Sequence, residues 1–308
     1  MVTNEVMSDK RIVLVLGNGF DMDLGWKTSY KDFVNSNIWP FKNTSKGLGW
    51  WLNQKTNSEN WYDLEALLRA YACLDVGSGM LFDKDLDRKQ FIILKRKIGE
   101  YLQKEEKKQI NRTSLASNLL WWLSGFWKNT KIYSFNYTDL AKIVSKNGMS
   151  DNTHCEYLHG ELSKQSHILG IDDKANIRKG YEFLRKSSNH SYHSSNLLDD
   201  MRKAECIIFY GLCFGDIDYP YFRLFFQERC SEQLYKTNNT KKSICFFTKD
   251  EDSECLIKNN ISEMNDHKMV EFFSFNEIAF FHETEKWQSS NDIDEYFNHK
   301  LSLHLNFV

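Results

Sequence analysis

Prolines are scarce in this 308-residue sequence, and its cysteines are not paired by spacing. The 2 prolines, Pro40 and Pro220, are too few for a proline-rich linker or a collagen-like segment. The 7 cysteines are odd in number and include no Cys-x-x-Cys pair, so their spacing provides no four-thiolate zinc site. We therefore expect reduced thiols, as in the cytoplasm, and no bound metal.

Long hydrophobic runs are also missing. The apolar run at residues 12–16 is too short for the core of an export signal and is closed by Gly17. A second run at residues 119–123 ends at Ser124 and Gly125, well short of a membrane span. The sequence therefore predicts a cytoplasmic protein without a membrane partner.

Neither sign of charge is in large excess. Lysine and arginine number 40 and the acidic residues 42, which leaves a formal charge of -2. A general nucleic-acid-binding protein would normally carry a basic excess, so we expect no such partner. Aromatic residues make up 15% of the chain, which suits a well-packed core and excludes general disorder.

Short apolar runs alternate with helical patterns along the chain. The run at residues 11–16 is typical of a strand buried on both faces of a parallel sheet. Further strands are predicted at residues 131–135, 206–210 and 243–247, with weaker candidates at 155–158, 167–170 and 269–273. Helical patterns lie at residues 30–37, 138–146, 219–235 and 292–304. The alternation predicts an α/β fold, with a Rossmann-like, mostly parallel sheet flanked by helices.

Two intervals depart from this alternation. Residues 50–128 have a helical pattern throughout, with apolar residues at three- and four-residue spacing. We predict a large helical insertion after the first strand, lying over the edge of the sheet, within a single domain that spans residues 1–308. The polar interval at residues 174–203 predicts a mobile loop or lid.

The first predicted strand leads directly into Gly17-Asn18-Gly19-Phe20-Asp21. Glycines at a strand-to-helix turn let backbone N–H groups approach a phosphate, and the helix N-terminus favours an anion. The segment lacks the third glycine of the dinucleotide fingerprint and the lysine of a P-loop. A tight turn in which Asp21 caps a helix explains it equally well.

Polar residues also follow the next two strands. Asn136 lies after the second strand, where open α/β sheets bind ligands, although it could simply turn the chain. His159 follows a weaker strand and could accept a proton near neutral pH, although a lone histidine is more often structural.

The strand at residues 206–210 leads into a glycine-rich, acidic loop that contains Gly211, Cys213, Asp216 and Asp218. The two aspartates could hold ribose hydroxyls, or they could simply favour the dipole of the following helix. Cys213 lies near a predicted helix N-terminus, but the sequence offers it no histidine partner.

Together these segments resemble the AbiH family of bacterial abortive-infection proteins, from about residue 11 to residue 225. The matching motifs are Gly17-Asn18-Gly19-Phe20-Asp21, Thr28-Ser29-Tyr30-x-x-Phe33, Trp61-x-Asp63-x-Glu65, Phe135-Asn136-Tyr137-Thr138, His159-Gly160, Leu169-Gly170-Ile171 and Gly215-Asp216-Ile217-Asp218-Tyr219-Pro220-Tyr221-Phe222. One departure is clear, because Gly211-Leu212-Cys213-Phe214 stands where the family usually has Gly-His-Ser-Leu.

The AbiH family is remotely similar to sirtuin-like domains, which bind NAD through a glycine-rich first loop. This similarity implies that Asn136 and His159 act together in catalysis. It also implies that the nucleotide is held by Gly17, Asn18, Gly19, Phe20, Asp21, Thr28, Gly211, Cys213, Asp216 and Asp218. The sequence lacks the four-cysteine zinc module of the deacetylases, which argues against protein deacylation.

Our first hypothesis is a phage-defence protein that hydrolyses NAD or a related nucleotide at the nicotinamide–ribose bond. Cleavage of this bond builds positive charge on the sugar. The reaction needs a phosphate cradle, a group that orients water and a base. The turn at residues 17–19, Asn136 and His159 could fill these three roles.

Two other hypotheses remain open. A nucleotide-sensing module could bind without cleaving and contact a partner through the helical insertion; the departure at Leu212 and Cys213 favours it. A metal-dependent nuclease could use acidic pairs such as Asp216-x-Asp218, Asp21-x-Asp23 or Asp83-x-Asp85-x-Asp87 as oxygen ligands for magnesium. A phage-derived trigger and a homo-oligomer are compatible with each hypothesis.

Overall fold

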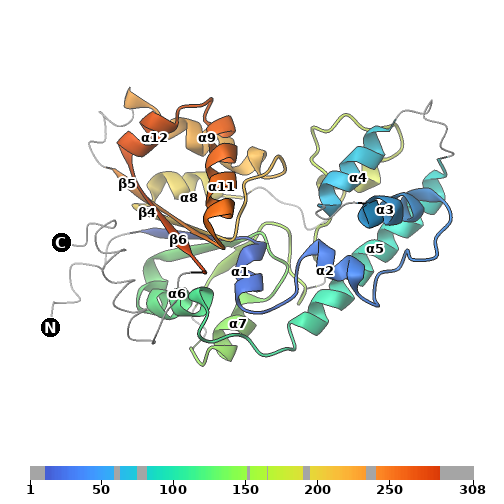
Figure 1. Cartoon of the computed structure of the whole chain (residues 1–308), viewed down its shortest axis with the longest axis horizontal. Helices are drawn as coiled ribbons and strands as arrows, with labels where there is room; N and C mark the ends of the chain where they lie inside the picture. Colours follow the sequence, from blue (N-terminus) through green and yellow to red (C-terminus); the bar gives the residue numbers. More distant parts are fainter. Residues whose placement is uncertain are drawn as a thin grey trace.

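The computed structural model describes residues 11–58, 63–74, 82–150, 153–164, 166–189, 195–233 and 241–284. These residues form a six-stranded, all-parallel sheet in the order β3-β2-β1-β4-β5-β6 (Figure 1). The strands are β1 (Ile12–Leu16), β2 (Thr130–Ser134), β3 (Cys155–Tyr157), β4 (Cys206–Tyr210), β5 (Lys242–Thr248) and β6 (Asn276–His282). The predicted α/β fold is confirmed. The helix predicted at residues 292–304 lies outside the described residues.

The apolar sequence of the central strands fills both faces of the sheet. In β1, Ile12 and Leu14 pack into one core, whereas Val13 and Val15 pack into another on the opposite face. The first core is covered by α1 (Asn18–Asp23), α6 (Leu115–Leu123) and α7 (Leu140–Lys146). The second is covered by α8 (Leu197–Lys203), α9 (Tyr219–Glu228), α11 (Glu251–Met264) and α12 (Met269–Phe275). The sheet is therefore the middle of three layers.

A third hydrophobic core belongs to helices that lie beside the sheet. It contains residues from α2 (Tyr30–Asn35), α3 (Gly47–Ser58), α4 (Leu64–Cys73) and α5 (Lys84–Glu105). Residues 162–184, which follow β3 in the sequence, complete this core. Figure 1 shows these helices grouped at one end of the molecule. The predicted helical interval 50–128 is thus divided, because α6 covers the sheet while α3, α4 and α5 form the separate core.

Two of the strand predictions were wrong, and one strand was not predicted. The strand predicted at residues 269–273 is helix α12, which buries Phe272 and leaves Val270 78% exposed. The sixth strand is instead β6, which follows α12 directly. Residues 167–170 form no strand, and only the next residue, Ile171, makes an isolated bridge, with Arg185. Short apolar runs fit helix and strand alike, so tertiary packing decides between them.

The segment 174–203 contains the short 3-10 helices η3 (Glu182–Leu184) and η4 (Lys186–Ser188) and helix α8. It buries Leu184 and Lys186; the mobility predicted for it stays a prediction. All seven cysteines are free thiols. Among the described residues, no helix is long and apolar enough to cross a membrane.

Candidate functional site

The loops that follow β1, β2, β3 and β4 meet at the carboxyl edge of the sheet. Strand order reverses between β1 and β4, because β2 lies on one side of β1 and β4 on the other. Open α/β sheets bind ligands in the crevice outside such a switch point. All the sequence-predicted site residues except Thr28 lie in these loops or at the starts of the helices that follow them.

The glycines after β1 and β4 pack directly against each other. The N–H groups of Gly17 and Gly19 donate to the carbonyl oxygens of Tyr210 and Gly211 at 2.8 and 3.0 Å. A Cβ atom at Gly19 would lie 2.5 Å from the Cα atom of Gly211, which itself has a φ of +66°. These glycines therefore allow two loops to approach, and both N–H groups already have protein acceptors. Phosphate binding by this turn stays a prediction.

The unusual segment Leu212-Cys213-Phe214 is anchored by its two apolar side chains. Phe214 adopts a φ of 56° and is fully buried, with its ring 5.1 Å from that of Phe209. Leu212 fills the space beside Gly17. Desolvation, together with the charge of the Asp218 carboxylate, raises the pKa of the Cys213 thiol. A raised pKa disfavours the reactive thiolate.

Asp21 and Asn136 belong to a buried polar cluster beneath the first loop. Asn136 donates from Nδ2 to the Gly17 carbonyl oxygen at 2.9 Å, and Thr138 donates from Oγ1 to Asp21 Oδ2 at 2.7 Å. Asp21 is only 1% exposed. Desolvation outweighs its hydrogen bonds with Thr138 and Asn136 and raises the pKa of Asp21 to about 7. Asp21 therefore changes charge near neutral pH.

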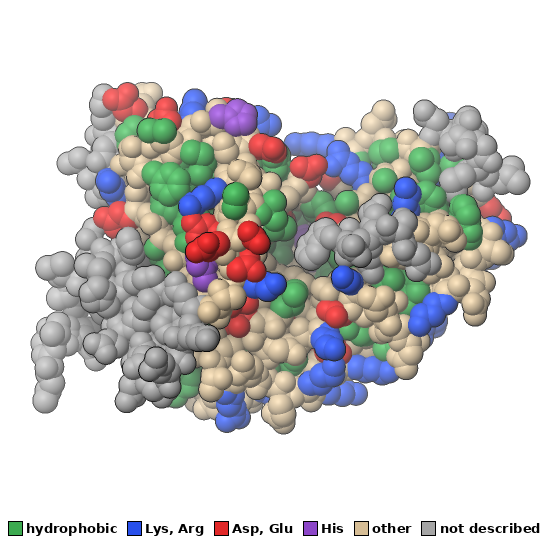
Figure 2. All heavy atoms as spheres, viewed as in Figure 1, with side chains coloured by type: hydrophobic (Ala, Val, Ile, Leu, Met, Phe, Trp, Pro, Cys, Tyr) green, Lys and Arg blue, Asp and Glu red, His purple; other side chains and the backbone are tan. Residues whose placement is uncertain are grey.

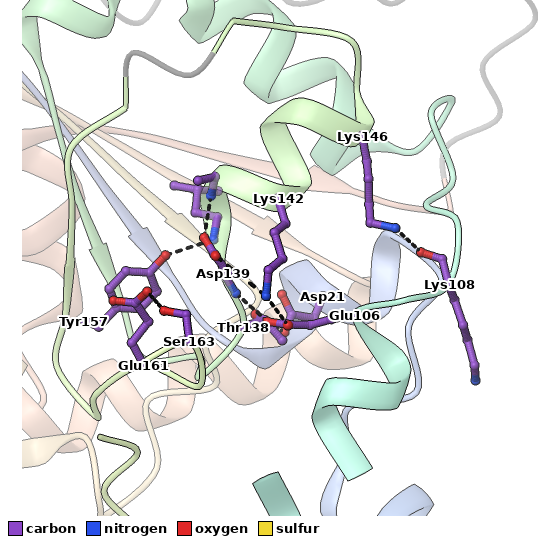
Figure 3. Close-up of polar contacts among 12 residues, drawn as sticks. Asp21, Glu106, Lys108, Thr138, Asp139, Lys142, Lys146, Tyr157, Glu161 and Ser163 are labelled. Atoms are coloured by element: carbon purple, nitrogen blue, oxygen red, sulfur yellow. Dashed lines mark hydrogen bonds and ion pairs between the residues drawn. The ribbon is translucent and has the colours of Figure 1, made fainter. Parts of the chain in front are cut away.

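An ion pair lies next to this cluster. Figure 3 shows Asp21 and Thr138 close to Glu106, Asp139 and Lys142. Glu106 accepts a hydrogen bond from the Asp139 N–H and pairs with Lys142 Nζ at 2.8 Å. The Glu106 carboxylate contributes to the raised pKa of Asp21.

The remaining residues predicted for the first loop have different environments. Asn18 is exposed and accepts a hydrogen bond from Thr28 Oγ1 at 2.6 Å, so these two residues do lie together. Phe20 is buried in the core, with its ring 5.4 Å from that of Tyr210. Asp216 is exposed in the turn directly before α9. Asn18, Thr28 and Asp216 are thus accessible, whereas Phe20 shapes the loop from below.

His159 lies in a second charged cluster. Its Nε2 atom is 3.1 Å from Lys186 Nζ, and Lys186 Nζ is 2.9 Å from Glu65 Oε2. Lys186 and Glu65 are 4% and 5% exposed. Desolvation and the Lys186 charge lower the pKa of His159 well below 6.5, so the imidazole is neutral at pH 7. His159 is therefore in the charge state of a proton acceptor, but its Nε2 faces an ammonium group.

Two further carboxylates act on this cluster. Desolvation, together with the charges of Asp63 and Glu65, raises the pKa of Asp218 to about 7, although Lys186 opposes this. Desolvation also raises the pKa of Asp63, the N-cap of α4. The cluster therefore joins α4 of the helical insertion to the loops after β3 and β4.

Sequence reasoning missed Glu65 and Lys186. Glu65 lies in the motif Trp61-x-Asp63-x-Glu65, which was recognised without a role for the glutamate; Trp61 lies outside the described residues. Lys186 lies in the polar segment 174–203, for which the sequence predicts a mobile loop or lid. Only the tertiary structure brings these two charges together, so no local pattern could have identified the pair.

Asn136 and His159 occupy the same edge of the sheet without forming one hydrogen-bonded unit. Phe135 precedes Asn136, and its ring lies 5.3 Å from the His159 ring. Asn136 bonds to Gly17, while His159 bonds to Lys186. Their joint action in catalysis stays a prediction.

The acidic pairs considered as metal ligands do not converge. Asp21 bonds to Thr138, whereas Asp23 accepts from Tyr210 at 2.7 Å. Asp87 is enclosed in the insertion core, where it accepts from Tyr71 and Tyr181. Across the described ranges, no group of three or more His, Cys, Asp or Glu side chains could hold a metal ion.

Acidic side chains also gather near the ends of α1 and β6, as Figure 2 shows. Glu283 follows β6, and desolvation together with the charge of Asp23 raises its pKa to about 8. This pair lies at the carboxyl edge but on the α1 side of the sheet, apart from the His159 cluster.

The sequence matches the model of a known protein family. The model of a family described as "Bacteriophage abortive infection AbiH" matches residues 13–240, well over half of the chain. No curated protein matches the sequence significantly. The matched range begins in β1 and extends past α9, so it includes every strand-end residue of the candidate site.

Proposed function

Because the chain belongs to the AbiH family of bacteriophage abortive-infection proteins, we propose that it serves phage defence by binding and hydrolysing NAD or a related nucleotide. The bond cleaved would be the one between nicotinamide and ribose. A phage-derived molecule would trigger the reaction in the infected cell. The abortive-infection role follows from the family, while the substrate and the reaction are our proposal.

The observation that carries the proposal is the position of the polar side chains. Asn136, His159 and Asp218 follow three different strands and reach the carboxyl edge of a sheet in the 3-2-1-4-5-6 order. This strand order and this edge are where dinucleotides bind in Rossmann-like folds. Asn18, Thr28 and Asp216 offer polar groups at the rim of the same edge.

The chemistry requires few groups. The C1′–N bond of the ribosyl nicotinamide breaks, a C1′–O bond to water forms, and nicotinamide leaves with the bonding electron pair. Asn136 would orient the water, and neutral His159 would accept its proton. Positive charge grows on the sugar in the transition state, and the carboxylates of Asp63 and Asp218 favour that charge.

A nucleotide-sensing module without catalysis is the second candidate. The favouring observation is that the Gly17 and Gly19 N–H groups already donate to protein carbonyls. In addition, Leu212 and Phe214 are apolar side chains that are packed into the fold, so neither is available to contact a ligand. Such a module would signal through its helical insertion or through a second copy of the chain.

Incubation of the purified full chain with NAD separates these candidates. We expect release of nicotinamide and ADP-ribose, detected by chromatography, and the release should survive a chelator. His159→Ala and Asn136→Ala should each lower turnover by roughly a hundred-fold or more, the usual contribution of a positioned proton acceptor or orienting group. Calorimetry should show that both variants still bind NAD. Binding by the wild-type protein without product would support the sensing module, and product formation only with magnesium would contradict our proposal.

A further inference from the structure

Two enclosed charged residues next to His159 have no role in the reaction described above. Glu65 belongs to α4 of the helical insertion, and Lys186 belongs to η4 after β3. Both are almost fully buried, and Lys186 Nζ contacts Glu65 Oε2 at 2.9 Å and His159 Nε2 at 3.1 Å. Burying an ion pair is costly unless its geometry is good, so this arrangement calls for a specific role.

Hydrogen bonds between backbone groups fix the position of Lys186. The N–H group of Lys186 donates to the Ile171 carbonyl oxygen at 3.0 Å, and the Ile171 N–H donates to the Leu184 carbonyl oxygen at 2.8 Å. Gly170 permits this contact, because a Cβ atom there would lie 2.7 Å from the Leu184 oxygen. The motif Leu169-Gly170-Ile171 therefore provides the support on which Lys186 rests.

The contact with Lys186 determines which imidazole nitrogen carries the proton. A lysine ammonium group can only donate hydrogen bonds, so His159 Nε2 must accept. The ring proton then lies on Nδ1, and the ring also hydrogen-bonds to the backbone of Phe135. The rings of Phe135 and Tyr221 flank the imidazole at 5.3 and 6.2 Å.

We propose that Lys186 is the positioning residue of His159: it fixes the imidazole in its neutral, Nδ1-protonated form and connects it through Glu65 to the helical insertion. The charged groups that face this site are Asp63 and Glu65 from the α4 side and Asp218 from the α9 side, where the titratable phenol of Tyr221 also lies. Desolvation of Lys186 is outweighed by the charge of Glu65 and by the hydrogen bond to it, which raise the pKa of Lys186 and keep it cationic.

The catalytic consequence of this inference rests on the proposed function. For Nε2 to take a proton from water, the Lys186 ammonium must move toward Glu65 and Asp218. His159 Nε2 would then be able to act as the base only when Lys186 has moved away from it. This movement depends on the position of Glu65 and therefore on the position of the helical insertion. The positioning itself can be tested without any substrate.

The first experiment is a histidine-selective NMR titration of the full chain. The His159 signal is identified by its loss in His159→Ala. In the wild-type protein, the ring should stay neutral with the proton on Nδ1 down to low pH. In Lys186→Met, its apparent pKa should rise by about one unit or more, because a nearby positive charge has been removed. The double variant Lys186→Met/Glu65→Gln should show the same rise without leaving a buried carboxylate unpaired, so a folding defect of the single variant does not block the test.

Lys142→Met is the matched control. Lys142 also pairs with a buried glutamate, Glu106, at 2.8 Å, but it has no histidine neighbour in that pair. The His159 titration should be unchanged in this variant. If Lys186→Met and its double variant also leave the titration and the tautomer unchanged, the inference is wrong.

The pH dependence of turnover gives a second, separate readout. If His159 is the base, activity is lost as the pH falls through the pKa of His159. Because that pKa is higher in the double variant, the acidic limb of the pH profile should move to higher pH. Its shift should equal the shift seen by NMR; a uniform loss of turnover at all pH values would instead indicate a merely structural role and overturn the inference. An NMR shift in a protein that releases no nicotinamide would support the positioning role and refute the proposed hydrolysis.

Discussion

Replacing Asp21 with asparagine should make the stability of the protein less dependent on pH. The Asp21 carboxyl is enclosed beneath the first loop and accepts a hydrogen bond from Thr138 at 2.7 Å. Desolvation raises its pKa from 3.8 to about 7. Asparagine keeps the oxygen that Thr138 needs, but it cannot ionise.

The sign and size follow from linkage between protonation and folding. The pKa of Asp21 is higher in the folded state than in the unfolded state, so its contribution to stability is complete below about pH 4 and is lost as the pH rises through about 7. Each unit of pKa difference corresponds to about 1.4 kcal/mol. Between pH 5 and pH 8, the wild-type protein should lose roughly 2–3 kcal/mol of unfolding free energy because of this group.

Urea unfolding at four pH values between 5 and 8 measures this effect. The free energy of unfolding of Asp21→Asn, relative to wild type, should rise across this range by roughly 2–3 kcal/mol. Asp200→Asn is the control. Desolvation of Asp200 is outweighed by hydrogen bonds from Lys131 and Tyr133, which lower the pKa of Asp200. The difference in unfolding free energy between this variant and the wild type should therefore stay constant above pH 5. A constant difference for Asp21→Asn as well would refute the reasoning.

Three further predictions concern packing, buried charge and thiols. Gly19→Ala places a Cβ atom 2.5 Å from Gly211 and should cost roughly 1–3 kcal/mol in thermal or urea unfolding, whereas Gly125→Ala, with nothing within 4 Å, should be tolerated. Asp87→Ala leaves the hydroxyls of two tyrosines without their buried acceptor and should cost roughly 3 kcal/mol or more, whereas the exposed Asp85→Ala should change stability by less than about 0.5 kcal/mol. Because all seven cysteines are free, a reducing agent should not change the Tm; a large drop on reduction would contradict the free thiols.

The sheet was predictable where the sequence is apolar without interruption. The β1 and β4 segments are uninterrupted apolar runs followed by glycine, which is typical of a parallel strand covered on both faces, and the structure buries both along their whole length. The end of the chain was less predictable. Residues 269–273 and β6 are adjacent segments of similar aromatic content, and which one joins the sheet depends on pairing with β5.

The candidate site was predictable residue by residue but not as an arrangement. Sequence alone drew attention to Asn136, His159 and Asp218, because each follows a predicted strand. It could not show that Lys186 would be buried against His159, since that contact depends on how residues 162–184 fold back over α4. Electrostatic shifts such as that of Asp21 have the same origin, because they depend on burial rather than on neighbours in the sequence.

The core of the helical insertion has a consequence for how the chain is made. Its helices α2–α5 are synthesised early, but the apolar faces they share are completed by residues 162–184, which emerge from the ribosome only after β3. Until then these faces have no cover, and chaperones have an interval in which to bind them. A nascent chain halted between α5 and residue 162 should therefore be protease-sensitive, and protection should begin once residue 184 has left the exit tunnel.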